Sequence, residues 1–404
     1  MVNSIYLFQR ALRLNDNLGL IECLKNSDNV YPVFCVDPRQ ADPKNNPYFS
    51  PFSLGFMYES LLDLDKQLKE HGSKLYILYG EPHKILPNII KKHKIEKIYM
   101  NKDYTPFANK RSQELSKICK IIEPEDYLLF SPGEIVTGSG KAYRVYTPFL
   151  RATERKKIKT PEKISPTILK KLAKQINPEK KAWDLLEKNS KYSLYYDPGG
   201  RTEGLKRLES LNETQKNYSK CRDYLTYKTS NLSAYIKFGC VSIREAWEAF
   251  GNISGKSGQD LRKQLIWREY YYQMYIDFPE YLEWDKNPEE VKLGEKAPDI
   301  VKACFNQLDT TGFLHNRGRM ILAHYLLHNK NKYWKACDKL YARRLVDYDP
   351  LVNIGNWLWI KKQPKFRWLK PEVQFKKWDK SCLSVKENKN IPHGSYTNYF
   401  LNLK

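Results

Sequence analysis

Short apolar runs alternate with helical patterns over the first part of the chain. Four runs have the length and composition of buried strands and cover residues 4–8, 30–36, 74–79 and 97–100. Residues 52–69 place leucine and methionine at helical spacing, and Gly72 follows as a stop signal. Strands that alternate with helices predict an α/β domain with a Rossmann-like parallel sheet.

The pattern changes in the middle of the chain. Residues 150–195 are rich in lysine and contain Pro161, Pro166 and Pro178, which predicts a surface connection with some helix near 168–175. From Gly204 onward the pattern is helical almost throughout, with one strong helix over 261–275 and another that includes 320–327. We therefore expect an α/β domain at 1–130, a linker at 131–195 and an all-helical domain at 196–404.

The composition favours a polyanionic partner. The formal net charge is +23, which favours nucleic acid, although lysines scattered over an ordinary surface would give the same number. No apolar run reaches membrane-spanning length and no signal-peptide pattern is present, so we expect a cytoplasmic or nuclear protein that is not secreted. The eight cysteines form no CxxC pair and no zinc or iron–sulfur pattern, which predicts reduced thiols and no metal.

The segment with the strongest chemical signal is RRLVDYDPLVNIGNWLWI, residues 343–360. It carries Asp347 and Asp349, then Asn353, beside a tryptophan-rich run. Carboxylates in such surroundings need partners if they are buried, and Arg319 is a candidate.

Two further segments have suggestive patterns. Residues 227–239 carry Thr229, Ser230 and Ser233 at a predicted helix N-terminus, which suits a phosphate group or a simple cap. Gln264 and Trp267 are three residues apart and share one helix face, which could be a site or a half-buried surface.

Taken together, these segments resemble the photolyase/cryptochrome family. The resemblance covers nearly the whole chain and includes FQRALRLNDN (8–17), PGGRTEGLKRL (198–208), TSNLSAYIKFG, QLIWRE, TGFLHNRGRM and the aspartate–tryptophan segment, in the family's order. Class I and archaeal-type photolyases for cyclobutane pyrimidine dimers are the most similar members. The resemblance implies FAD in the helical domain and light-driven DNA repair, in which reduced FAD passes an electron to a dimer flipped out of the duplex.

The resemblance also implies roles for individual residues. The residues matching the phosphate side of FAD are Tyr218, Thr229, Ser230, Leu232 and Ser233. Those matching the ring side are the ion pair Arg319–Asp347, then Asp349, and Asn353 opposite flavin N5. The electron-transfer triad matches Trp357, Trp334 and Trp284. The residues matching contacts to the dimer or to DNA phosphates are Arg222, Gln264, Trp267, Asn316, Arg317, Met320, Trp359 and Arg367.

Several residues bear on which lesion is repaired. Asn316 and Met320 stand where (6-4) photolyases carry histidines, which favours cyclobutane dimers. Gln264 replaces a typical glutamate, and the segment after Trp359 is shorter than usual, so we expect reduced but real repair. A cryptochrome-like photoreceptor, a (6-4) photolyase and a DNA-binding relic without catalysis are the alternatives. The absence of a long polar tail after Trp378 favours repair over signalling.

Family members often hold a second, antenna chromophore in the sheet domain. Lys110 follows Asn109 where folate-binding members tend to have glutamate, which disfavours folate. The phrases DPRQ (37–40) and DYTPF (103–107) resemble archaeal-type photolyases, so a flavin or deazaflavin is favoured, although both phrases could be ordinary turns and the site could be empty. We expect a monomer.

Overall fold

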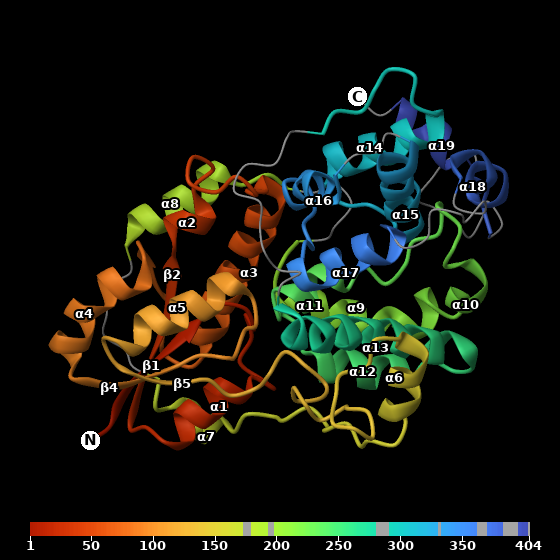
Figure 1. Cartoon of the computed structure of the whole chain (residues 1–404). Coiled ribbons are helices and arrows are strands. Elements are labelled where there is room, and N and C mark those ends of the chain that lie inside the picture. Colours follow the sequence, from red (N-terminus) through yellow and green to blue (C-terminus); the bar gives the residue numbers. More distant parts are fainter. Residues whose placement is uncertain are drawn as a thin grey trace.

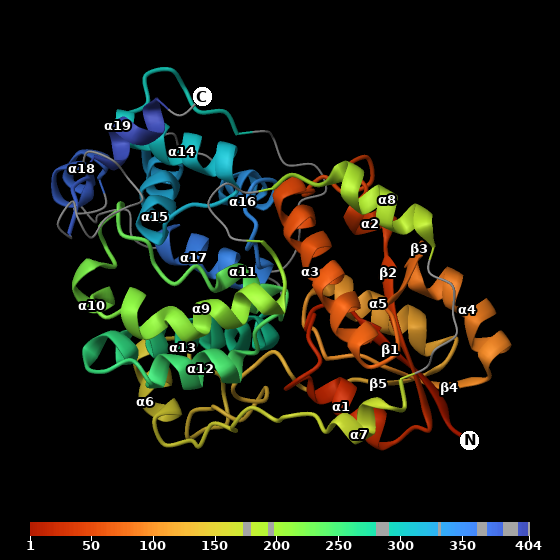
Figure 2. The same cartoon turned by 180° about the vertical axis from the view of Figure 1, so that it is seen from behind.

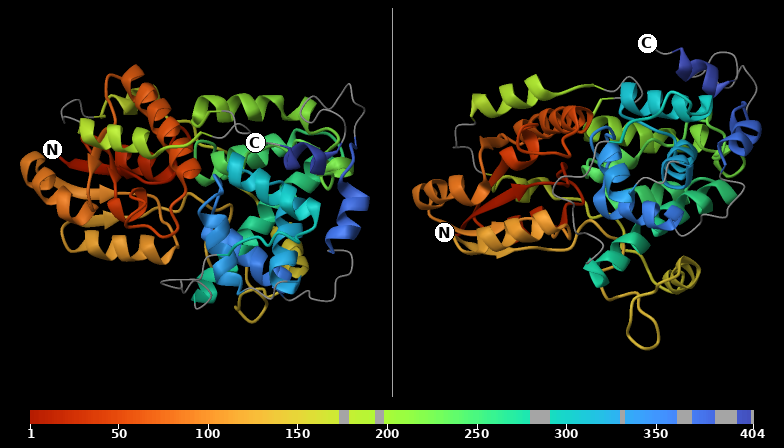
Figure 3. Two further views of the ribbon diagram at one scale, coloured as in Figure 1. Left: turned by 90° about the horizontal axis from the view of Figure 1, so that it is seen from above. Right: turned by 45° about the horizontal axis from the view of Figure 1, so that its top comes forward.

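The computed structural model describes residues 1–172, 179–192, 198–279, 291–329, 333–361, 370–382 and 395–402. An α/β lobe and a helical lobe lie side by side, as Figure 1 and the view from above in Figure 3 show. The predicted fold class is confirmed. Trp284 and Arg367 lie outside the described residues.

The α/β lobe is built on a five-stranded sheet with all its strands parallel, in the order β3-β2-β1-β4-β5. The four expected strands are confirmed to within two residues at each end. The fifth was missed because it has three residues, of which Lys120 is exposed. The strands are β1 (Asn3–Phe8), β2 (Asn29–Val36), β3 (Tyr76–Tyr79), β4 (Ile95–Tyr99) and β5 (Lys120–Ile122).

Helices cover both faces of this sheet. Tyr6 and Phe8 of β1 point into one core with leucines of α1 and α3, whereas Ile5 and Leu7 point into another with α4 and α5. Burial on both faces explains why the strands are continuous apolar runs. The expected helix over 52–69 is confirmed as α3, and Gly72 has a positive φ just after its end. The helices of this lobe are α1 (Leu18–Lys25), α2 (Pro38–Ala41), α3 (Pro51–Glu70), α4 (Pro82–His93) and α5 (Pro106–Ser116).

The connecting segment contacts both lobes. Its first helix, α6 (Tyr146–Thr153), packs against the helical lobe. The short α7 (Pro166–Leu169) and then α8 (Lys180–Asn189) lie against the α/β lobe, and Figure 2 shows α8 beside α3. Leu172 adds a parallel bridge to Val30 of β2.

The helical lobe is arranged around α13, which packs against α12, α17 and α10. The helix expected over 261–275 is confirmed within α13, and the one expected over 320–327 begins at Asn316 and continues into a π-helical turn, Tyr325–Asn329. Within the described residues, no helix has the length and apolar composition needed to cross a bilayer. The helices are α9 (Arg201–Thr214), α10 (Tyr218–Cys221), α11 (Ser233–Lys237), α12 (Ile243–Gly251), α13 (Lys256–Asp277), α14 (Asp299–Thr311), α15 (Asn316–His324), α16 (Trp334–Ala342), α17 (Pro350–Lys361), α18 (Pro371–Trp378) and α19 (Tyr396–Leu401).

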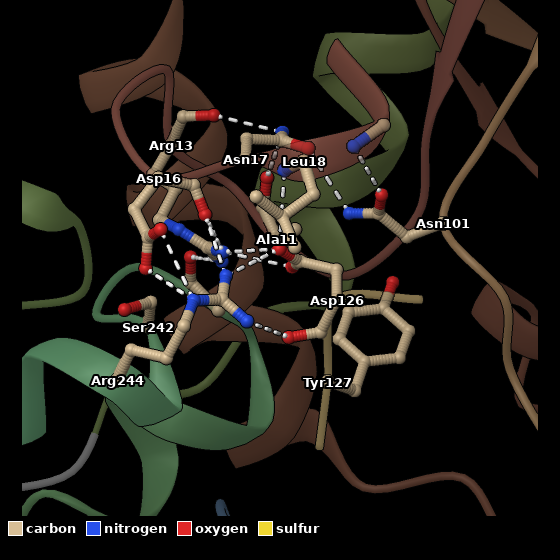
Figure 4. Close-up of polar contacts among 12 residues, drawn as sticks. Ala11, Arg13, Asp16, Asn17, Leu18, Asn101, Asp126, Tyr127, Ser242 and Arg244 are labelled. Atoms are coloured by element: carbon tan, nitrogen blue, oxygen red, sulfur yellow. Dashed lines mark hydrogen bonds and ion pairs between the residues drawn. The ribbon is translucent and has the colours of Figure 1, made fainter. Parts of the chain in front are cut away.

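A buried network of charges joins the two lobes (Figure 4). Arg244 of α12 donates to Asp16 at 2.9 Å and to Asp126 at 2.8 Å, and Arg13 donates to Asp126 at 2.8 Å. All four side chains are almost fully buried. Because each buried charge has an opposite partner and further hydrogen bonds, the network can tolerate burial and fixes the lobes relative to one another.

The prediction that all cysteines are reduced thiols was wrong. Cys221 at the end of α10 and Cys382 after α18 form a disulfide, although 161 residues separate them. The other six cysteines are free. The spacing of cysteines along the sequence could not reveal this pair, because the folding of the helical lobe brings the two residues together.

Candidate functional site

A cavity of about 560 Å³ opens in the helical lobe among α10, α11, α13, α15 and α17. This volume lies within the range of small-molecule sites. Trp334 is not among the lining residues and is buried at the start of α16. The site residues predicted from the sequence that line the cavity are Tyr218, Arg222, Thr229, Ser230, Leu232, Ser233, Gln264, Trp267, Asn316, Arg317, Arg319, Met320, Asp347, Asp349, Asn353, Trp357 and Trp359.

One end of the cavity is lined by hydroxyl and amide groups. Thr229, Ser230 and Asn231 form the turn before α11, which begins at Ser233. Asn231 has φ of 49° and is buried, and its Oδ1 atom has no hydrogen-bond partner within the described part of the chain. A buried polar atom without a partner beside a cavity indicates a site for a polar ligand group.

An ion pair lies on another wall. Arg319 of α15 donates through Nη2 to both carboxylate oxygens of Asp347, at 2.9 and 2.8 Å, as the sequence suggested. Its Nε donates to the carbonyl oxygen of Leu314 at 2.9 Å. Held from two sides, the guanidinium keeps a positive charge beside the cavity.

A buried acid fixes the side-chain amide of Asn353. Asn353 donates through Nδ2 to Oδ1 of Asp338 on α16, and the Tyr348 hydroxyl donates to Oδ2 at 2.7 Å. Because this bond fixes which way the amide is turned, Oδ1 of Asn353 can accept from a cavity ligand. Burial raises the pKa of Asp338 to about 6.

Sequence reasoning missed Asp338. The one indication of Asp338 in the sequence is that it is the single acid of the mainly apolar helix WKACDKLYA, four residues after Trp334. Such an acid is either paired or functional, because a buried carboxylate without partners is costly. The position of its partner, however, depended on how α16 packs against α17.

Asp349 lies where the two lobes meet. Its Oδ2 accepts hydrogen bonds from Arg10 and from the Tyr272 hydroxyl, both at 2.6 Å. Burial alone would raise the pKa of Asp349, but the positive charges of Arg10 and Arg268 and its hydrogen bonds hold that pKa below its usual value. The sequence indicated the acid but not its arginine, which is 339 residues away.

Lys237 is a buried cation that sequence reasoning also missed. Its Nζ donates to Ser53 Oγ at 2.6 Å and to the carbonyl oxygen of Val346 at 3.0 Å. Burial, followed by repulsion from Arg10, lowers the pKa of Lys237 to about 7.

The same cavity is also lined by the aromatic and amide residues expected at a lesion pocket. Gln264 and Trp267 share the cavity face of α13, and Trp359 comes from α17. Asn316 lies beside Met320 on α15, with Nδ2 3.9 Å from Sδ.

The two described arginines expected near DNA differ in exposure. The side chain of Arg222 is about one-third exposed and lies 3.4 Å from Asp260. Arg317 is largely buried and forms an ion pair with Asp223. A phosphate could therefore reach Arg222 more readily than Arg317.

A second cavity, of about 470 Å³, lies between the lobes at the carboxyl ends of β1, β2 and β4. In parallel sheets, ligands bind at this edge, where the chain reverses the order of its strands. Charged and aromatic side chains line it, including Asp37, Arg39, Asp103 and Phe107. Lys237 and Asp349 line both cavities, so the two sites are neighbours.

A Rossmann-like lobe joined to a helical lobe with a ligand-sized cavity is the architecture of a two-domain ligand-binding protein. Two family models match: DNA photolyase over residues 4–167, and the FAD binding domain of DNA photolyase over residues 261–388. The chain belongs to the photolyase/cryptochrome family.

Individual relatives include both branches of this family. The structure of an archaeal photolyase from Sulfolobus tokodaii with two FAD molecules has a TM-score of 0.77 and 31% identity, covering 94% of this chain and 88% of that one. A deoxyribodipyrimidine photo-lyase from Synechococcus is 27% identical over 95% of this chain and 86% of its own length. Cryptochrome-1 of Erithacus rubecula is 27% identical over 89% of this chain and 64% of its own length.

The residues of the helical-lobe cavity fit FAD. The hydroxyls of Thr229 and Ser230 can donate to a diphosphate, and the unpartnered Oδ1 of Asn231 can accept from an O–H or N–H of the cofactor. Arg319 offers a positive charge to an electron-rich ring. The Asn353 amide presents an oxygen to a ring N–H.

Proposed function

We propose that this protein repairs DNA in a light-dependent reaction, using FAD in the helical-lobe cavity to split cyclobutane pyrimidine dimers. One observation carries the proposal: a single cavity is lined both by Arg319, Asp347 and Asn353 and by the aromatic walls Trp267 and Trp359. A cofactor ring held by the first group would lie next to a flipped pyrimidine dimer held by the second.

The chain's own residues would prepare each component. Reduced FAD, when bound and excited, supplies the electron that opens the dimer. Arg319 offsets negative charge on the ring, and Asp338 keeps the Asn353 oxygen turned towards it. Trp267 and Trp359 offer stacking surfaces to a flipped dimer, where each stacked base contributes about 1–3 kcal/mol.

The chemistry of the pocket favours cyclobutane dimers over (6-4) photoproducts. Repair that needs an acid–base step requires a titratable group at the lesion. Asn316 and Met320 supply none. The amide of Gln264 can hydrogen-bond a dimer but cannot exchange a proton, which supports slower repair than with a glutamate.

Tryptophans offer a route for reducing the cofactor. Trp357 lines the cavity and is buried on α17, and Trp334 is buried at the start of α16. We propose that electrons reach the cavity through Trp334 and Trp357. The third expected member, Trp284, lies outside the described residues.

The second cavity suits an antenna chromophore. Arg39 stacks over Phe107, at 5.0 Å from the ring centroid, and pairs with Asp37 at 2.6 Å. This combination fits a flat, polar-edged ring system, which favours a flavin or deazaflavin. Its position beside Lys237 and Asp349 would place an antenna next to FAD.

The test compares the two lesions. The purified protein is checked for bound flavin by absorbance, reduced, and illuminated with oligonucleotides that carry either lesion. We expect light-dependent loss of cyclobutane dimers alone, and faster loss in Gln264→Glu. Lys263→Gln, which changes the net charge equally from the next position of α13, is the control and should match the wild type.

The other possible outcomes of this test would favour another function or contradict the proposal. Bound flavin without repair in either the wild type or Gln264→Glu would favour a cryptochrome-like photoreceptor. Repair of (6-4) photoproducts would contradict the inference from Asn316 and Met320. A protein without flavin would contradict the whole proposal.

A further inference from the structure

The aromatic wall Trp267 rests on a residue from the segment that connects the lobes. The ring of Tyr146 stacks on Trp267 with 3.5 Å between ring centroids and 6° between the ring planes. Tyr146 is the first residue of α6, and its hydroxyl donates to the backbone carbonyl oxygen of Lys263 on α13, at 3.1 Å. Tyr146 is therefore attached to the helix that carries Trp267 by a stack and by a hydrogen bond.

Tyr146 covers one face of the indole and does not itself line the helical-lobe cavity. Among the described residues that line this cavity are Trp267 and Tyr271, but not Tyr146. Tyr270 lies edge-on to both stacked rings, with centroids 5.9 Å away at 77° and 83°. Tyr271 contacts the indole at 5.7 Å. These rings leave the indole little freedom to tilt, while Trp267 still lines the cavity.

We propose that Tyr146 is a positioning residue that holds the plane of Trp267 and thereby sets the preference for damaged over undamaged DNA. The inference rests on the proposed function, because it assumes that Trp267 stacks against an extruded lesion. A wall that is already fixed in the unbound protein loses little conformational freedom when the lesion binds. Undamaged duplex, held through its phosphates, does not use this wall.

The experiment measures binding of two duplexes, one with a cyclobutane dimer and one undamaged, by the flavin-loaded protein in the dark. Immobilising, on binding, one side chain that is free in the unbound protein costs about 2- to 10-fold in affinity. We expect Tyr146→Leu to weaken binding of the damaged duplex by this factor and to leave the undamaged duplex unchanged. Tyr146→Phe keeps the ring and should restore the preference to within about 2-fold.

A matched control comes from the same segment. Tyr143 contacts Phe149 at 6.1 Å, so Tyr143→Leu removes a comparable ring that packs on a different partner. It should leave both affinities unchanged. Tyr146→Met, which keeps apolar volume without a flat face, gives a second test if the leucine variant loses its flavin or its cooperative unfolding.

The outcomes separate this inference from the proposed function. If the wild type prefers damaged DNA and Tyr146→Leu and Tyr146→Met keep that preference, the role of Tyr146 is wrong. Equal weakening for both duplexes, or the same effect from Tyr143→Leu, would also overturn it, since that is the signature of a general structural role. A wild type without any preference for damaged DNA would overturn both proposals.

Discussion

Replacing Asp338 by asparagine should stabilise the protein and impair its cofactor site at once. The carboxylate is 3% exposed and accepts hydrogen bonds from Asn353 and from Tyr348. Asparagine has almost the same shape but no charge, so the variant removes the cost of a buried anion. It also removes the reason for the Asn353 amide to keep one orientation, because asparagine at position 338 can donate as well as accept.

The size of the stability effect follows from the pKa. Burial raises the pKa of Asp338 from its ordinary value of 3.8 to about 6 in the folded protein. The folded state therefore binds the proton more tightly than the unfolded state, and the wild type loses unfolding free energy as the pH rises between these values. The loss amounts to about 3 kcal/mol, whereas the variant has no such term.

The assay is urea unfolding of both proteins at about pH 4 and about pH 7.5. We expect the free energy of unfolding of Asp338→Asn, relative to the wild type, to rise by about 2.4 kcal/mol between the two conditions, because the carboxyl of the unfolded wild type is already partly ionised at pH 4. Other titrating groups cancel in this comparison. If the difference between the two proteins is the same at both pH values, then Asp338 is not a buried acid of raised pKa and the reasoning fails.

The cofactor effect is measured separately, as the midpoint potential of bound FAD. An Asn353 oxygen turned towards the ring favours the reduced form, whose N5 carries a hydrogen. Loss of one such hydrogen bond, at about 0.5–1.5 kcal/mol, should lower the one-electron potential by about 20–65 mV. An unchanged potential would show that Asp338 does not orient this amide.

Two further substitutions test contacts that hold distant segments of the chain together. Arg244→Ala leaves the buried carboxylate of Asp16 without its arginine, although Asp126 keeps Arg13, and should cost about 3–5 kcal/mol in urea unfolding. Lys25→Ala, which breaks an exposed ion pair, should cost less than about 1 kcal/mol. Similar losses in the two variants would mean that the interlobe network adds no stability. Cys382→Ser opens a loop closed over 161 residues and should cost up to about 5 kcal/mol. A reductant should bring the wild type to the stability of this variant, and an equal effect of the reductant on both proteins would contradict the role of the disulfide.

The elements of the fold were largely readable from the sequence because their signals are local. Strands buried on both faces give continuous apolar runs, and α3 repeats leucine at helical spacing, so these elements were identified with nearly correct bounds. The three-residue strand β5 was missed because it carries no such run. Many of the residues that line the helical-lobe cavity also lie in the few short segments that the sequence singled out.

Most partners of the polar side chains could not be predicted from the sequence. The sequence indicated that Asp347, Asp349 and Asn353 needed partners, and it named Arg319 for one of them. It gave no sign that Asn353 is held by Asp338 or that Asp349 is paired with Arg10 across the lobe boundary. Each of these contacts depends on how separate elements pack, and no local pattern records that.

The sequence by itself determined which residue types were available: an apolar sheet, an acid–amide–tryptophan segment, and hydroxyls before α11. The tertiary structure decided what each of them does. Folding joined Cys221 to Cys382, set Tyr146 against Trp267, and placed Lys237 between the two cavities. The reason is physical: hydrophobic periodicity is written along the chain, whereas hydrogen bonds, ion pairs and stacking require atoms from distant segments to lie within a few ångströms of one another.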